Sequence, residues 1–146
     1  MMEIKPYLHK VQYYETDMMG VVHHSNYVRW MEEARIDFMD QLGFSYAKME
    51  AAGVFSPVTK VSCEYKHSSR FGDEISIEAC VESFRAASLA IRYEMKTASG
   101  ELVCEGLSEH VFLNREGHIV RLRKEMPAFC EALQQIVDGG SDPITD

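Results

Sequence analysis

Residues 15 to 35 read ETDMMGVVHHSNYVRWMEEAR, and the pattern of the chain changes within this stretch. Up to Val22 there is no helical periodicity. From Asn26 onward, apolar residues recur every three or four positions, which predicts an amphipathic helix of about 16 residues with its C-terminal stop near Gly43. Ser25 or Asn26 is the expected N-cap of this helix. The apolar stripe consists of Tyr27, Trp30, Met31, Ala34, Phe38 and Leu42.

The start of this helix is predicted to be open to an anion. Its first turn holds no Asp or Glu, so no acidic side chain of its own neutralises the positive end of the helix dipole or the unpaired backbone N–H groups. Asp17 lies on the loop just before it and could act as a nucleophile or a general base where that helix start binds a developing oxyanion. The common alternative, in which Asp17 only caps its own turn, stays open at this point.

His23 and His24 follow the loop directly, and their imidazoles could serve as bases or metal ligands. No HExxH or comparable ligand spacing accompanies them, so we predict structural or substrate-lining roles and no metal site. The four cysteines are too far apart for a CxxC-type site and are predicted to be isolated free thiols.

The rest of the chain predicts an α+β domain, because one long apolar helix and one sheet must bury each other. Residues 1–140 are expected to form this single domain, and residues 141–146 a loose C-terminal tail. In the strand from Leu102, the small residues Cys104, Gly106 and Ser108 share one face, which would let a helix approach closely. The expected strands are 7–15, 54–67, 74–84, 88–97, 102–114 and 118–122; the shorter helices are 46–52 and one beginning at Pro127.

Composition and motif content argue against several classes of function. The 146 residues carry a formal net charge of −8, which argues against nucleic acid or an anionic membrane surface as the main partner. No stretch suits a signal peptide or a membrane span, so a cytoplasmic location is expected. The GxSxG, GxGxxG and GxxxxGK[ST] motifs are absent. For a phosphorylated ligand, Arg85 at a predicted hairpin tip is the preferred contact, although a solvated turn charge is the commoner role.

The stretch YYETDMMGVVHHSNYVRWMEEAR resembles the opening of the hotdog-fold acyl-CoA thioesterases of the 4-hydroxybenzoyl-CoA thioesterase family. The resemblance rests on Thr16-Asp17, Gly20, Val21-Val22, Asn26-Tyr27 and Ala34-Arg35. It continues through YKHSSRFGD from Tyr65, RAASLAIRYEM from Arg85 and HVFLNREGHIVRLRKEMP from His110. Two departures stand out: the family often has Tyr at His23 or His24, and Pro at Ser68 or Ser69.

This resemblance implies a hotdog fold, with a long central helix wrapped by an antiparallel sheet of five or six strands and a short C-terminal helix. It implies dimers that often pair into tetramers, with the partner subunit lining the pocket. Asp17 would be the catalytic carboxylate, as nucleophile or general base, and the backbone N–H of His24 would polarise the thioester carbonyl. Substrate-binding positions would be Gly20, Val22, His23, Asn26, Tyr27, Arg85 and Ser88.

The predicted reaction is hydrolysis of an acyl-CoA thioester to a carboxylic acid and free coenzyme A, without a metal or a separate cofactor. Two alternatives remain open: a non-catalytic acyl-CoA-binding hotdog module and a thioesterase acting on acyl carrier protein. A hotdog hydratase is disfavoured because its Asp-x-Asn-Pro-x-x-His pattern is absent.

Overall fold

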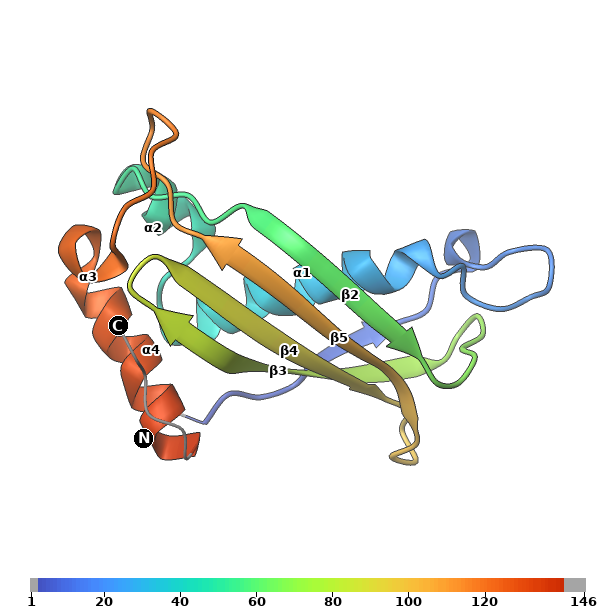
Figure 1. Ribbon diagram of the computed structural model, residues 1–146. Helices are drawn as coiled ribbons and strands as arrows, with labels where there is room; N and C mark the ends of the chain where they lie inside the picture. Colours follow the sequence, from blue (N-terminus) through green and yellow to red (C-terminus); the bar gives the residue numbers. More distant parts are fainter. Residues whose placement is uncertain (1–2, 141–146) are drawn as a thin grey trace.

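A computed structural model describes residues 3–140 and has one long helix packed along a five-stranded antiparallel sheet (Figure 1). The strand order is β1-β3-β4-β5-β2. The long helix is α1 (Ser25–Leu42), and η1 (Tyr13–Glu15) is a short 3-10 turn before it. The strands are β1 (Tyr7–Lys10), β2 (Val58–Tyr65), β3 (Glu74–Arg85), β4 (Ser88–Lys96) and β5 (Leu102–Val111); the remaining helices are α2 (Tyr46–Ala51), α3 (Leu122–Glu125) and α4 (Pro127–Gly140).

The predicted amphipathic helix is confirmed in α1. Its apolar stripe is buried in one core cluster with side chains of β3, β4 and β5. The helix ends where Gly43 adopts a φ of 87°, in the left-handed region that glycine tolerates best. The predicted N-cap was wrong: His24 holds that position and Ser25 is the first helical residue.

The small-residue face of β5 sets the distance between helix and sheet. Cys104, Gly106 and Ser108 are all buried. A Cβ placed on Gly106 would lie only 2.8 Å from Sδ of Met31 on α1, closer than real contacts allow. The close approach predicted for this strand is therefore confirmed, and a larger residue at position 106 would displace the Met31 side chain.

Two predicted strands differ from the structure. The first strand ends at Lys10, because Glu15 caps the backbone N–H of Gln12 and turns the chain into η1. In place of a strand over 118–122, one isolated bridge joins Leu113 to Ile119 before α3 begins. The predicted start of the last helix at Pro127 is confirmed. The predicted tail, 141–146, lies outside the described residues.

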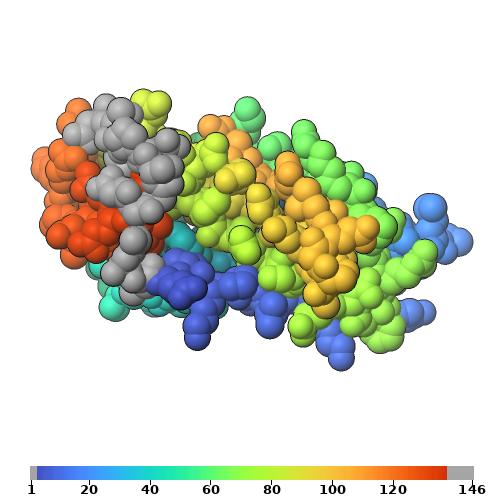
Figure 2. Space-filling model, turned by 90° about the horizontal axis from the view of Figure 1, so that it is seen from below, coloured from blue at the N-terminus to red at the C-terminus, as the bar shows by residue number. Residues whose placement is uncertain are grey.

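Strand β2 forms one of the two edges of the sheet, and β1 forms the other. Among the described strands, β2 pairs only with β5, and Val58, Val61 and Tyr65 on it are exposed. The two ends of the sheet also differ: the loop before α1 projects at one end, and α3 and α4 gather at the other (Figures 1 and 2).

Candidate active site

The loop that carries Asp17 is closed at its base by an antiparallel bridge between Thr16 and Val22. The Asp17 backbone N–H donates to the Val21 carbonyl at 2.9 Å, and Gly20 makes the reversal with a φ of 77°. Oδ1 of Asp17 accepts the Met19 N–H at 2.8 Å, so Asp17 does cap its own turn. Within residues 3–140 its second carboxylate oxygen has no hydrogen-bond partner, so capping leaves one oxygen available for chemistry.

Glu15 anchors this loop to the core through a buried carboxylate, only 4% exposed. It accepts hydrogen bonds from the Gln12 N–H at 2.8 Å and the Trp30 indole N–H at 2.7 Å, and it lies 2.9 Å from Nε2 of His9. Burial alone would raise the pKa of Glu15. The hydrogen bonds from Gln12, Trp30 and His9 outweigh burial and hold that pKa below its usual value.

The backbone of Glu15 positions the start of α1. Its carbonyl accepts the His23 N–H at 2.9 Å and the side-chain amide of Asn26, also at 2.9 Å. Asn26 is buried, and this hydrogen bond occupies its amide nitrogen; a contact with substrate stays a prediction. Glu15 therefore fixes both the loop and the helix start, a role that the sequence did not reveal.

The helix start is open, as predicted. No Asp or Glu lies in its first turn, and within the described part of the chain the His24 backbone N–H has no acceptor. The next N–H, of Ser25, donates to Nδ1 of His23 at 3.2 Å, and the His23 and His24 rings stack with centroids 4.3 Å apart. Unpaired N–H groups at a helix start attract negative charge.

A cavity of about 350 Å³ adjoins this helix start. Tyr27, which is buried, and Tyr65 line it, and the Tyr65 hydroxyl donates to the His24 carbonyl at 3.3 Å. Burial, together with the nearby Cys63, raises the pKa of Tyr65 to about 12, so its hydroxyl stays protonated. The lining residues are Val21, Val22, His24, Tyr27, Tyr65, Lys66, His67 and Ser68.

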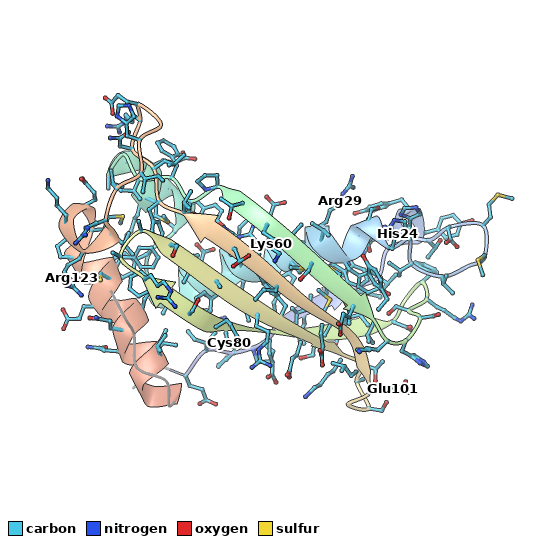
Figure 3. All side chains as sticks on the ribbon, viewed as in Figure 1. His24, Arg29, Lys60, Cys80, Glu101 and Arg123 are labelled. Atoms are coloured by element: carbon cyan, nitrogen blue, oxygen red, sulfur yellow. The ribbon has the colours of Figure 1, made fainter. Side chains whose placement is uncertain are left out.

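Arg85 and Ser88 lie at the opposite end of the sheet from Asp17. They flank the turn between β3 and β4, and from Ser88 to Met95 strand β4 extends about 23 Å. Figure 3 shows His24, at the start of α1, and Arg123, on α3, at opposite ends of the molecule. One chain therefore does not bring Arg85 and Ser88 together with Asp17.

The end that carries Arg85 is cationic. A cavity of about 280 Å³ there is lined by four basic side chains together with Phe84, Ala86 and Cys130. The sequence singled out Arg85 as a contact for a phosphorylated ligand, without indicating that it belongs to a cluster. The four are Arg85, Arg121, Arg123 and Lys124.

No group of three His, Cys, Asp or Glu side chains among the described residues is placed to hold a metal ion. The four cysteines form no disulfide. No helix in residues 3–140 is long and apolar enough to cross a membrane.

Comparison with known proteins points in one direction. The family model described as the thioesterase-like superfamily matches residues 11–136. The putative acyl-CoA thioesterase YneP of Bacillus subtilis is 32% identical over 127 residues, covering 86% of this chain and 92% of that protein. The 4-hydroxybenzoyl-CoA thioesterase of a Pseudomonas species is 25% identical over 127 residues, covering 82% and 89%. The crystal structure of a DHNA-CoA thioesterase from Staphylococcus aureus superposes with a TM-score of 0.88 at 32% identity, covering 97% of both chains.

Proposed function

The chain belongs to the thioesterase-like superfamily and is a thioester hydrolase, and we propose that it hydrolyses acyl-CoA thioesters with Asp17 and the backbone N–H of His24. One observation carries this assignment of roles. The bridge between Thr16 and Val22 brings together the two segments that carry these groups. Asp17, with one free carboxylate oxygen, follows Thr16, and His24, whose N–H has no acceptor among the described residues, lies just after Val22.

In the proposed mechanism the thioester carbonyl oxygen accepts the His24 N–H. Negative charge that develops on this oxygen is stabilised by that donor and by the positive end of α1, and one such donor contributes on the order of 10² to 10³ in rate. The free oxygen of Asp17 either attacks the carbonyl carbon or takes a proton from an attacking water. Attack would form a mixed anhydride and release the thiolate of coenzyme A; water would then cleave the anhydride, giving the acid and restoring Asp17.

The anionic part of coenzyme A needs cations, and the cavity lined by four basic side chains lies at the Arg85 end of the chain, away from Asp17. We propose that the partner subunit's Arg85 and its basic neighbours supply them. If two β2 edges pair antiparallel about a two-fold axis, Tyr65 of one chain lies near Val58 of the other. Val58 belongs to the Arg85 end of the sheet, so this pairing brings each cationic end toward the other chain's Asp17 end. Pairing of two such dimers into a tetramer remains part of the proposal.

For the acyl group and its carrier we propose classes of substrate and not a single compound. Relatives named for aromatic thioesters, 4-hydroxybenzoyl-CoA and DHNA-CoA, make aromatic acyl-CoAs the first substrates to assay. An acyl carrier protein thioester is the second candidate carrier. We also propose a cytoplasmic location, which suits a chain with four unpaired thiols, and no metal or separate cofactor.

The test is thiol release from aromatic, short and long acyl-CoAs by wild-type and Asp17→Asn protein. The substitution keeps an acceptor for the Met19 N–H but removes the anion, so kcat/KM should fall by about 10²- to 10⁴-fold with the fold and oligomer unchanged. Asp40→Asn, on the exposed side of α1, is the matched control and should keep full activity.

An Asp17→Asn variant with most of its activity would refute the assigned role. Wild-type protein that binds acyl-CoA without releasing thiol would indicate the non-catalytic binding module, and faster turnover of an acyl carrier protein thioester would change the carrier.

A further inference from the structure

Arg35, on α1, is a buried cation whose protein partners carry no negative charge. The residue is 8% exposed. Its Nε donates to the Tyr46 hydroxyl at 2.9 Å and its Nη1 to the Tyr93 hydroxyl at 3.1 Å. Among the described residues no carboxylate oxygen lies within ion-pair distance of it. Two hydroxyls fix the plane of the guanidinium but leave its charge unbalanced.

The hydrogen bonds beyond Tyr93 add no anion either. His110 Nδ1 lies 3.1 Å from the Ser56 carbonyl, which can only accept, so Nδ1 donates and Nε2 accepts from the Ser108 hydroxyl at 2.8 Å. Ser108 in turn accepts from Tyr93 at 2.8 Å. Burial, with a contribution from the charge of Arg35, lowers the pKa of His110 to about 4, so this imidazole is neutral at pH 7.

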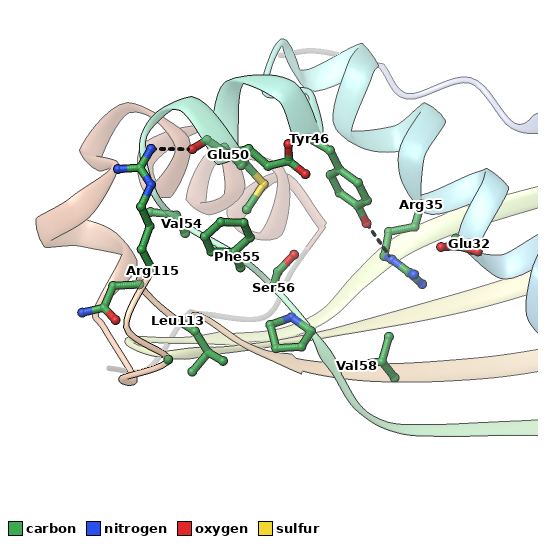
Figure 4. Close-up of a pocket in the computed structure, with 14 residues that line it drawn as sticks. Glu32, Arg35, Tyr46, Glu50, Val54, Phe55, Ser56, Val58, Leu113 and Arg115 are labelled. Atoms are coloured by element: carbon green, nitrogen blue, oxygen red, sulfur yellow. Dashed lines mark hydrogen bonds between the residues drawn. The ribbon is translucent and has the colours of Figure 1, made fainter.

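The guanidinium borders an apolar cavity of about 500 Å³, within the size range of small-molecule sites. No hydrogen bond in the described residues involves Nη2 of Arg35, and every fully buried side-chain nitrogen there has a partner. Nη2 is therefore accessible from one of the two cavities that Arg35 lines, this one or a neighbouring one of about 240 Å³. Figure 4 shows Arg35 and Tyr46 at one side of the cavity and Phe55 and Leu113 across from them. The apolar lining is Met49, Val54, Phe55, Pro57, Val58 and Leu113.

The other charged groups at this cavity are at its rim. Glu32 and Glu50 are exposed, and Arg115 is also exposed and donates to the carbonyls of Glu50 and Ala51. Arg35 is therefore the only buried charge among the residues that line the cavity. A desolvated guanidinium is stabilised best by a planar carboxylate, which can accept hydrogen bonds while it balances the charge.

We propose that this cavity is a binding site for a carboxylate with an apolar body, held with its carboxylate on Arg35 and its body against Val54, Phe55 and Leu113. Within one chain the site is separate from the hydrolytic centre, because from His24 to Arg35 helix α1 rises about 16 Å. The apolar lining and single cation suit an organic monoanion better than a phosphate. The site itself does not depend on the proposed function; only the source of the ligand does.

Two sources share this chemistry. One is the free acid that thioester hydrolysis releases. The other is a carboxyl group at the far end of an acyl chain whose thioester carbonyl lies at His24.

Binding is tested with octanoate and, as a neutral analogue of equal length, octan-1-ol, monitored by ¹H–¹⁵N chemical shifts of the full-length protein at pH 7. Octanoate should shift the amides of residues 54–56, 58 and 113–117, and octan-1-ol should not. Equal binding of the alcohol, or octanoate shifts confined to residues 21–27 and 65–68, would overturn the proposal. This comparison needs only wild-type protein.

Variants identify the cation. Arg35→Met should weaken octanoate binding about tenfold or more, whereas Arg115→Met, a cation at the rim of the same cavity, should change it by less than about twofold. The reverse ranking, or an unchanged affinity in Arg35→Met, would refute the role of Arg35. Arg35→Lys keeps the charge if Arg35→Met does not fold, and it should bind octanoate more weakly than wild type but more tightly than octan-1-ol; binding no tighter than the alcohol would contradict the proposal.

Kinetics separate the sources. If the ligand is the released acid, octanoate inhibits hydrolysis in wild-type protein and not in Arg35→Met. If it is part of the acyl group, a CoA thioester of octanedioic acid is preferred over octanoyl-CoA, and Arg35→Met removes that preference. Octanoate binding at Arg35 without any thiol release would refute the proposed function and leave the site standing; hydrolysis without octanoate binding would do the opposite.

Discussion

The two ends of the sheet present different functional groups. At the Asp17 end, a closed loop presents a carboxylate oxygen and an unpaired helix-start N–H. At the Arg85 end, basic side chains surround a cavity in a chain whose net charge is −8. The first end suits a reacting carbonyl and the second a phosphorylated carrier. Their separation within one chain is the reason that we propose a site formed by two copies.

The same ends differ in how they bury a titratable group. Glu15 is buried in its charged form, because its hydrogen bonds lower its pKa despite burial. His110, which pairs with Val58 and Leu89 toward the Arg85 end, is buried in its neutral form. Acid is therefore expected to weaken the two ends in different pH ranges.

The largest expected effect comes from mixing two inactive variants, Asp17→Asn and Arg85→Glu, co-expressed with different tags. If Asp17 and Arg85 act across the dimer, each heterodimer contains one site with both native residues. With random pairing, about a quarter of the wild-type sites are restored. Thiol release at low acyl-CoA concentration measures this, with each variant alone as the control; a mixture no more active than its components would place both residues in one chain or remove Arg85 from the site.

A smaller but still large effect is expected from Glu15→Gln. The substitution leaves Gln12, Trp30 and His9 facing an uncharged amide in a buried position, which should lower the free energy of unfolding by about 3 kcal/mol. Because residue 15 anchors both the Asp17 loop and the start of α1, kcat should fall as well. Urea unfolding and thiol release test this.

Glu33→Gln is the control for Glu15→Gln, since the Glu33 side chain is 41% exposed at the edge of the same network. The Glu15 contribution should be present above the unfolded pKa of a glutamate, about 4.3, and disappear as the pH falls through its lower folded value. Equal stability of wild type and Glu15→Gln at pH 7 would contradict the anchoring role.

The smallest effect concerns His110 and the weakly acidic range. Its folded pKa of about 4 lies below the unfolded value of about 6.5, so the unfolded chain binds more protons between these values. The stability contributed by the neutral imidazole is complete above pH 6.5 and is lost as the pH falls toward 4. Between pH 7 and 4.5, wild type should lose roughly 2 to 3 kcal/mol more than His110→Asn.

Urea unfolding at the two pH values measures this difference. His118→Asn, at an exposed turn, is the matched control and should behave as wild type. A parallel decline in wild type and His110→Asn would show that His110 titrates normally in the folded chain.

The sequence predicted what depends on local pattern. The period of the apolar residues predicted α1, Gly43 marked its end, and the lack of acids in the first turn predicted an open helix start. The small residues around Gly106 predicted a close helix–sheet contact. Each of these needs only residues within a few positions of one another.

What the sequence did not reveal depends on distant partners. The local sequence predicts Glu15 as the end of a strand. Its buried role depends on contacts with His9 and Trp30, which only the folded chain brings to it. The helical pattern alone does not reveal that Arg35 is buried, because its partners Tyr46 and Tyr93 come from other elements. The separation of Arg85 from Asp17 follows from the strand order, which no local pattern contains.

The contact between Gly106 and Met31 also has a chemical consequence. Met31 is 1% exposed, its sulfur accepts the Cys63 thiol at 3.5 Å, and Gly106 leaves it only the room that a missing side chain provides. Oxidation of that thioether to the sulfoxide would add a polar oxygen to a tightly packed contact. An oxidised Met31 would have to shift within the contact between α1 and β5, so burial of this sulfur protects that contact from oxidants.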